Sequence, residues 1–203
     1  MAISMADISK LRSMTGAGMM DCKKALTEAE GDFDKAVEII RKRGQAIAAK
    51  RSDRDAAEGC ILAGAKDGFA ATIALKCETD FVAKNADFIA LAQQILDKAI
   101  EAKPATLEEL NGLSIGNSTI QQLITDRSGV TGEKMELGMY EFVNGEATFA
   151  YIHPGNRLAS VVAFNQKGVH EQVYKDIAMQ TAAMNPVAVD EAGVPADVIE
   201  KAK

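Results

Sequence analysis

Apolar residues recur at helical spacing in three successive stretches of residues 1–44, and each stretch is followed by a glycine. Gly16 can form a left-handed helix cap, Gly31 and Gly44 follow the other two stretches, and Asp32 is placed to cap the third helix. This pattern predicts a compact three-helix domain over residues 1–44. The positions expected to face its core are Ile8, Leu11, Met14, Cys22, Ala25, Leu26, Ala29, Phe33, Ala36, Val37 and Ile40.

We predict a helical, charged linker over residues 45–58. After it, the pattern of apolar residues changes from helical spacing to continuous runs. Two apolar runs then lie on either side of Lys66-Asp67-Gly68, which is typical of a β-hairpin. The second run is almost wholly apolar, so we expect it to lie inside a sheet.

A strongly amphipathic helix is predicted over residues 85–100, and weaker helical segments follow near 106–112 and 118–127, the last one capped by Ser118. Together with the hairpin, these helices predict a first α+β core subdomain over residues 59–133. The core-facing positions of the long helix are Phe88, Ala92, Ile95, Leu96 and Ala99.

Residues 134–203 predict a second, incomplete α+β core subdomain. Three antiparallel strands are expected over 134–165, with Asn144-Gly145 as a hairpin turn and the sequence HPGNR as a longer turn. A helix over 169–184 and a short helix in PADVIEKA complete the pattern. The long helix is expected to place Val173, Ile177 and Met184 inward. The fold class is therefore α+β, with three N-terminal helices followed by antiparallel sheets that carry helices on one face.

Composition describes an ordinary globular chain of 203 residues, 47% hydrophobic and 26% charged. The apolar runs are too short to span a bilayer and the N-terminus lacks a signal-peptide pattern, so we expect a cytoplasmic protein without a membrane partner. The three cysteines are well separated and lie beside apolar residues, which predicts buried free thiols in a reducing compartment. No CxxC pair is present and the chain has two histidines, so we expect neither a metal site nor a cofactor.

Charge is distributed unevenly. Residues 1–54 carry 11 Lys/Arg and 8 Asp/Glu, whereas the rest of the chain has a net charge of −9. The basic surplus lies in RKRGQAIAAKRSDR, residues 41–54, which is either a solvated helical face or a patch for an acidic partner or RNA. Because the remaining chain is acidic, we do not expect direct binding of nucleic acid in general.

The sequence contains no complete motif for nucleotide binding or for nucleophilic catalysis. The sequence TGAGMMDCKK has Asp21 where a dinucleotide fingerprint needs its third glycine, and it lacks the lysine and hydroxyl spacing of a phosphate loop. A thiol enzyme would need Cys60 or Cys77 beside His153, which the sequence does not place together. We therefore predict that the chain is not an enzyme, and we keep the thiol enzyme as a minor alternative.

Candidate anchors for a protein partner are more prominent. Phe81 lies where the second apolar run should end, so it is either a core plug or an anchor. Met19 and Met20 point about 100° apart on a helix, so at least one of them should be exposed as an adaptable contact. His153 lies in a turn, where it is an exposed residue or a contact.

Two long segments resemble the elongation factor Ts family, namely residues 11–32 (LRSMTGAGMMDCKKALTEAEGD) and 77–88 (CETDFVAKNADF). The sequence YIHPGNRLASVVAF is similar to a Tyr-x-His segment of that family. The resemblance covers essentially the whole chain, although family members commonly continue beyond the point that matches Lys203. The chain is therefore expected to lack the C-terminal part, which leaves its homo-oligomeric state open.

The resemblance implies a guanine nucleotide exchange factor for the translation GTPase elongation factor Tu. Residues 1–44 would form a ubiquitin-associated-like domain that binds the GTPase domain through Arg12, Met19 and Met20. The segment Thr79-Asp80-Phe81-Val82 would displace Mg²⁺, with Phe81 inserted between helices of the GTPase, and His153 would be a further contact. The alternative is a ubiquitin-associated-like module that binds a protein or RNA without exchange activity.

Overall fold

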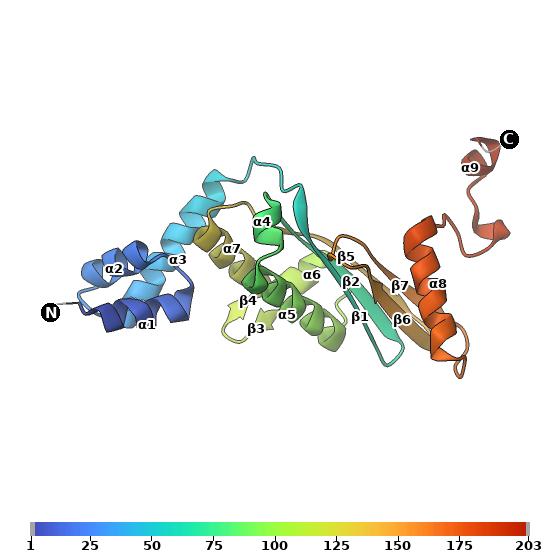
Figure 1. The fold of residues 1–203 in the computed structure, drawn as a ribbon, viewed down its shortest axis with the longest axis horizontal. Coiled ribbons are helices and arrows are strands. Elements are labelled where there is room, and N and C mark those ends of the chain that lie inside the picture. Colours follow the sequence, from blue (N-terminus) through green and yellow to red (C-terminus); the bar gives the residue numbers. More distant parts are fainter. Residues whose placement is uncertain (1–2, 202–203) are drawn as a thin grey trace. The chain divides into compact units, whose positions relative to one another are not determined.

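The computed structural model describes residues 3–201 (Figure 1). These residues form an α+β fold, as the sequence predicts. The chain divides into two compact units, residues 3–60 with 73–140 and residues 61–72 with 141–201. In chain order the elements are α1 (Met5–Thr15), α2 (Met19–Glu28), α3 (Phe33–Lys50), β1 (Glu58–Lys66), β2 (Phe69–Cys77), α4 (Asp80–Ala83), α5 (Ala86–Ala102), α6 (Leu107–Gly112), β3 (Ser114–Ile115), β4 (Ser118–Thr119), α7 (Ile120–Thr131), β5 (Glu136–Asn144), β6 (Ala147–Ile152), β7 (Ala159–Phe164), α8 (Glu171–Met184), the short 3₁₀ helix η1 (Glu191–Gly193) and α9 (Ala196–Lys201).

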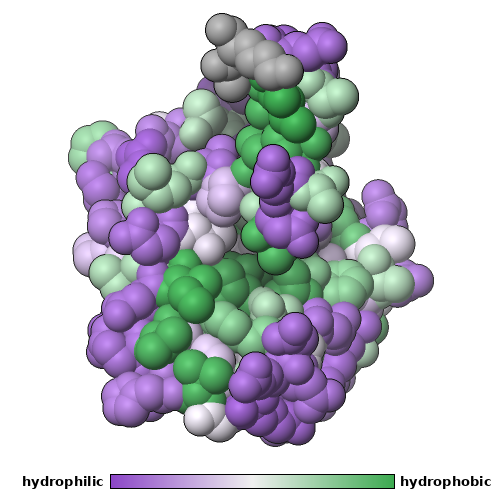
Figure 2. All heavy atoms as spheres, turned by 90° about the vertical axis from the view of Figure 1, so that its right-hand side faces the viewer, coloured by the Kyte–Doolittle hydropathy of each residue, from purple (hydrophilic) through white to green (hydrophobic). Residues whose placement is uncertain are grey.

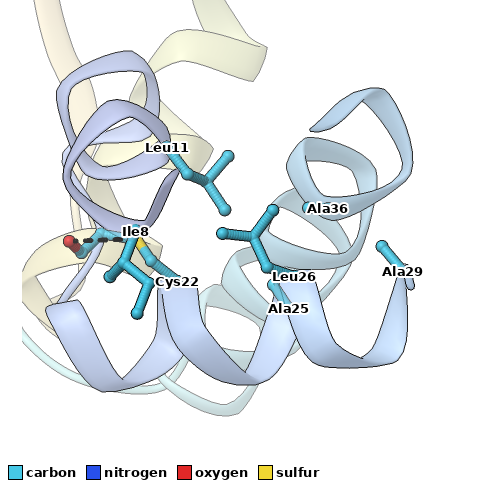
Figure 3. Packing of buried hydrophobic residues seen from close by; sticks show 8 residues of the cluster. Ile8, Leu11, Cys22, Ala25, Leu26, Ala29 and Ala36 are labelled. Atoms are coloured by element: carbon cyan, nitrogen blue, oxygen red, sulfur yellow. Dashed lines mark hydrogen bonds between the residues drawn. The ribbon is translucent and has the colours of Figure 1, made fainter. Parts of the chain in front are cut away.

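Helices α1, α2 and α3 begin the first unit and share a small hydrophobic core. Ser4 and Asp7 form a capping box at the start of α1, and Gly16 ends that helix in the left-handed conformation that glycine adopts without strain. In Figure 3 the side chains of Leu11 and Leu26 point toward each other from α1 and α2. The buried members of this core are Ile8, Leu11, Ala17, Cys22, Ala25, Leu26, Ala29 and Ala36.

Two expectations about these helices were wrong. Met14 is 56% exposed and does not belong to the hydrophobic core that the three helices share. Gly44 does not follow the third helix but lies buried inside α3, which continues to Lys50. The glycine serves close packing there, since a side chain on Gly129 of α7 would overlap the Gly44 backbone.

The long helix α5 supplies much of the remaining core of the first unit. Asn85 caps it by accepting hydrogen bonds from Asp87 N and Phe88 N, and its expected core positions are all buried. The next long helix, α7, is capped by Thr119 and not by Ser118 as predicted. Ser118 is buried instead and accepts a hydrogen bond of 2.9 Å from Arg41 Nη2.

The predicted hairpin is present between β1 and β2. Asp67 and Gly68 both have positive φ, as a two-residue turn of type I′ requires. Strand β2 lies at the centre of a three-stranded sheet of order β1-β2-β5, which agrees with its nearly continuous apolar sequence.

Strands β6 and β7 form a separate antiparallel pair in the second unit. The expectation of one sheet made by all three strands of residues 134–165 was therefore wrong, since β5 joins β2. Asn144-Gly145 does not close a hairpin, because Gly145 N donates to the carbonyl of Gly68 at 2.9 Å and its backbone lies against Phe164. The HPGNR turn is present, and Gly155 and Asn156 have positive φ in it.

Helix α8 packs on β6 and β7 with a face that differs from the predicted one. Ala178 is fully buried and its carbonyl accepts a hydrogen bond of 2.6 Å from Ser160 Oγ, whereas Val173, Ile177 and Met184 are exposed. Tyr174 packs on Phe164, so the inward stripe is shifted by one residue, from Val173 and Ile177 to Tyr174 and Ala178. Figure 2 shows hydrophobic side chains gathered on the face that carries α8 and the following segment.

We predict that Gly129→Ala destabilises the first unit, because the new methyl group must separate α3 from α7. Overpacking of this kind costs about 1–3 kcal/mol of unfolding free energy. Urea denaturation followed by circular dichroism measures the change. Gly112→Ala is the matched control, since a Cβ there meets no atom within 4 Å. Equal stability of the two variants would contradict the close crossing at Gly44.

Candidate protein-binding site

Phe81 lies on a single helical turn immediately beyond the end of β2. The strand ends at Cys77, Thr79 caps the four-residue helix α4, and the side chain of Phe81 is 84% exposed. A core plug would be buried, so this exposure argues against that interpretation, and the role of Phe81 as an anchor stays a prediction. A solvent-exposed phenylalanine on a short helix is the kind of aromatic side chain that a partner can bury.

The neighbours of Phe81 fix the turn from which it projects. Thr79 Oγ1 accepts a hydrogen bond of 3.5 Å from Val82 N. Asp80 pairs with Lys84 at 2.7 Å, and this hydrogen bond from the ammonium holds the pKa of the Asp80 carboxyl below its usual range. Thr79 and Asp80, the first two residues of the segment, are therefore held by local contacts, and Phe81 is left facing solvent.

A glutamate distant in sequence supports the same segment. Glu133 Oε2 accepts hydrogen bonds from Glu78 N at 3.2 Å and Thr79 N at 3.1 Å, and its Oε1 accepts one from Thr79 Oγ1 at 2.6 Å. Both carboxylate oxygens are thus used to bind the chain just before α4. Glu133 could not be identified from the sequence, because nothing in its local pattern relates it to residue 79.

Glu78 makes the reciprocal contacts. Its Oε1 accepts a hydrogen bond of 2.6 Å from Lys134 N, and its Oε2 accepts one of 2.9 Å from Arg54. The Lys134 N–H, followed by Arg54 and Arg51, holds the pKa of Glu78 below its usual value. Glu78, which directly precedes the Phe81 segment, therefore joins the linker after α3 to the residue that follows Glu133.

The basic run 41–54 pairs largely with acids of its own chain. Arg41 lies 3.1 Å from Asp126, and Arg43 lies 2.6 Å from Glu28. Arg51 and Arg54 both face Glu78, as described above. These ion pairs favour the interpretation of the run as a solvated helical face, whose cations pair with acidic residues of the same chain.

The cysteines are buried, and Cys77 lies in an environment that suppresses nucleophilic chemistry. All three are free and buried, as the sequence predicted. Cys77 Sγ lies 3.2 Å from the carbonyl of Thr79, to which it donates, and burial raises the pKa of this thiol to about 12. A thiol that stays protonated at neutral pH is a poor nucleophile, which argues against the thiol enzyme.

The expected contact residues of the N-terminal helices differ in burial. Arg12 is exposed on α1, and Met20 is 64% exposed on the first turn of α2. Met19 is partly buried and packs against the hydrophobic core of the three helices. The sequence argument that at least one of the two methionines is exposed is confirmed, and Met20 is the one available to a partner.

His153 belongs to the second unit, where it is exposed in the turn between β6 and β7. Its Nδ1 lies 2.9 Å from the hydroxyl of Tyr151, so the ring is oriented by a residue of β6. The segment Thr79-Asp80-Phe81-Val82 and the three candidate residues of the N-terminal helices lie in the first unit.

Two other features are absent from the part of the chain that the structure describes. Among residues 3–201, no group of three or more His, Cys, Asp and Glu side chains is arranged to hold a metal ion. Within the same residues, no helix combines the length and apolar character needed to cross a membrane.

Comparison with known proteins shows the family. A family model described as elongation factor TS matches residues 78–203. Proteins named elongation factor Ts from Porphyromonas gingivalis and Bacteroides thetaiotaomicron are 64% and 62% identical over 190 and 202 residues. A third, from Azobacteroides pseudotrichonymphae, is 55% identical over 201 residues. The chain therefore belongs to the elongation factor Ts family.

The relatives are longer than this chain. The matches cover 93% of the chain and 69% of the Porphyromonas protein, and 99% of the chain and 61% of the Bacteroides protein. The Azobacteroides protein is covered over 73% of its length by 99% of the chain. The matches to the Bacteroides and Azobacteroides proteins include helices α1 to α3, which we call the head, as well as the Phe81 segment and the turn of His153.

We predict that Cys77 resists alkylation in the folded protein. With its pKa raised to about 12, roughly one molecule in ten thousand carries the thiolate at pH 8, and burial further limits access. Iodoacetamide labelling followed by peptide mass spectrometry should show reaction at least about 100-fold slower without urea than with it. Rapid labelling of Cys77 in the native protein would contradict its protected position.

Proposed function

We propose that this chain is a guanine nucleotide exchange factor for elongation factor Tu that acts during polypeptide elongation in the cytoplasm. In this proposal it binds the GDP form of the GTPase, inserts Phe81 between helices of the GTPase domain, displaces Mg²⁺ and so promotes release of GDP. The observation that carries the proposal is the exposure of Phe81 on a turn whose backbone is held by Thr79 and Glu133. Membership of the elongation factor Ts family supports the exchange role.

The Mg²⁺ ion of the GTPase helps to hold the bound nucleotide. Mg²⁺ requires nearly ideal octahedral geometry, and together with phosphate contacts it holds the bound nucleotide. A side chain that shifts a helix near this ion distorts the coordination of Mg²⁺ and lowers the affinity of the GTPase for GDP. Because binding is reciprocal, an exchange factor that prefers the nucleotide-free GTPase must weaken nucleotide binding by the same factor.

The binding free energy of a single aromatic anchor is large enough to shift the nucleotide equilibrium in this way. An aromatic anchor buried at the centre of an interface contributes about 2–4 kcal/mol, which corresponds to roughly 30- to 1000-fold in an equilibrium constant. Phe81 has nearly its whole side chain available for such burial. No covalent bond is made or broken in this process, so the proposed activity needs no catalytic residue, cofactor or metal on this chain.

The head supplies a second proposed contact with the GTPase domain. Arg12 and Met20 offer exposed guanidinium and thioether groups there, and Met19 supports the same turn from its partly buried position. Two contacts on one chain raise the local concentration of the second after the first has formed. His153 is retained as a further, separate contact on the second unit.

A module that binds a protein or RNA without exchange activity is the alternative. It predicts that Phe81 is dispensable for any effect on bound GDP. The pairing of Arg41, Arg43, Arg51 and Arg54 with acids of the chain favours the protein partner over RNA, because phosphate recognition needs available cations.

We predict that the chain accelerates release of a fluorescent GDP from elongation factor Tu, and that Phe81→Ala reduces this acceleration by about 30- to 1000-fold. Stopped-flow fluorescence measures both rates. Val189→Ala is the control, because it removes an exposed apolar side chain outside every proposed contact. Binding to nucleotide-free Tu without acceleration would favour the alternative, and equal activity of Phe81→Ala and the wild type would rule out the anchor mechanism.

The two methionines of α2 provide a separate prediction. Met20→Lys should leave the thermal midpoint within about 2 °C of the wild type, since the side chain is exposed, and should weaken binding to Tu by about tenfold. Met19→Lys should lower the stability of the head itself, because Met19 packs on its core. Calorimetric titration and thermal unfolding separate the two effects. Unchanged affinity for Met20→Lys would remove this residue from the interface.

A further inference from the structure

We infer that Glu133 is a positioning residue for the Phe81 segment, an inference that rests on the exchange function proposed above. Glu133 does not belong to that segment, and its carboxylate is occupied by groups of this chain. Its effect on a partner therefore passes through Thr79 and α4. The inference concerns the order of the segment, which can be measured with or without a partner.

The first step is the shared hydroxyl of Thr79. Its proton is directed at Glu133 Oε1, with 2.6 Å between the oxygens, which leaves a lone pair to accept from Val82 N at the other side. The carboxylate thereby sets the orientation in which Thr79 caps α4. Without it, the hydroxyl can rotate and the cap loses its fixed direction.

The second step is the backbone before the helix. Glu78 N and Thr79 N lie where β2 has ended, so they have no partner strand to bond. Glu133 Oε2 accepts from both of them. Hydrogen bonds to an ionised carboxylate are stronger than those between neutral groups. These contacts therefore hold the backbone just before α4 in a single conformation.

Glu133 is itself held on both sides. Its N–H donates to Thr131 Oγ1 at 3.2 Å, and its carbonyl accepts a hydrogen bond from the buried hydroxyl of Ser128. It follows Gly132, which ends α7 with φ of 72°. The carboxylate is therefore presented from the fixed end of a twelve-residue helix.

The consequence concerns the cost of binding. A helix of four residues is not stable by itself in water, so α4 owes its order to its cap and to the chain around it. An anchor that is already ordered loses less conformational freedom when it is buried by a partner. Glu133 thus favours productive insertion of Phe81 without touching the GTPase.

A double-mutant cycle tests this inference. We expect Glu133→Ala to reduce the acceleration of GDP release by about tenfold at subsaturating protein, and to reduce it by less than about twofold in a Phe81→Ala background. Glu133→Gln keeps one oxygen that can accept from the two amides but turns an NH2 donor toward the Thr79 hydroxyl and removes the charge, so its loss should lie between zero and that of Glu133→Ala. An equal loss in both backgrounds would overturn the inference, because Glu133 would then act through something other than Phe81.

Glu136→Ala is the matched control. It removes the same charge nearby, and Glu136 pairs only with lysine side chains among its ion pairs, at 3.5 Å and 3.3 Å. Its effect on GDP release should be less than about twofold. A loss as large as that of Glu133→Ala would attribute the effect to charge and not to positioning.

Hydrogen exchange measured by NMR decides the structural part independently of activity. In Glu133→Ala the amides of Glu78, Thr79 and Val82 should exchange at least about tenfold faster, while those of α5 keep their wild-type rates. Unchanged exchange at these three amides would overturn the inference. If the wild-type chain fails to accelerate GDP release, the proposed function is wrong, and the exchange rates still decide whether Glu133 orders the segment.

Discussion

Two glutamate carboxylates satisfy the backbone where β2 ends, and the presentation of Phe81 depends on them. Glu133 accepts from the amides of residues 78 and 79, and Glu78 accepts from the amide of Lys134, so each glutamate binds the chain beside the other. Free backbone donors at a strand end would otherwise need water or a partner. Because both carboxylates are used in this way, the short helix that follows can hold an apolar side chain in solvent without collapsing onto the core.

The close crossing of α3 and α7 is the second constraint on the first unit. Gly44 and Gly129 let the two backbones approach, and Arg41 reaches Asp126 and Ser118 from the same helix. The helix that begins in the N-terminal core therefore continues as a partner of α7, whose C-terminal end carries Glu133 (Figure 1). The proposed contacts of the head and of Phe81 are thus supported by one continuous set of helices in this unit.

Local sequence signals predicted those features whose cause is local. Helical periodicity gave the buried face of α5, and Asp67-Gly68 gave the hairpin turn, because these depend on nearby residues. The prediction of a hairpin turn at Asn144-Gly145 was wrong, because contacts with residues distant in sequence determine the backbone path there. The pair has the composition of a hairpin turn, yet Gly145 N donates a hydrogen bond to the carbonyl of Gly68. Phe81 was found because it interrupts a pattern, whereas Glu133 gave no signal, since its partners are hydrogen-bonding atoms 54 and 55 residues earlier.

That separation along the chain has a consequence for the order of events during synthesis. Residue 79 is made long before residue 133, so a growing chain contains Phe81 before it contains the carboxylate that orders its helix. Closing a loop of this length costs conformational entropy that local helix formation does not. The proposed binding surface therefore gains the contact that orders it only after residue 133 has been made, so an N-terminal fragment that ends before α7 contains Phe81 without the carboxylate that holds its helix.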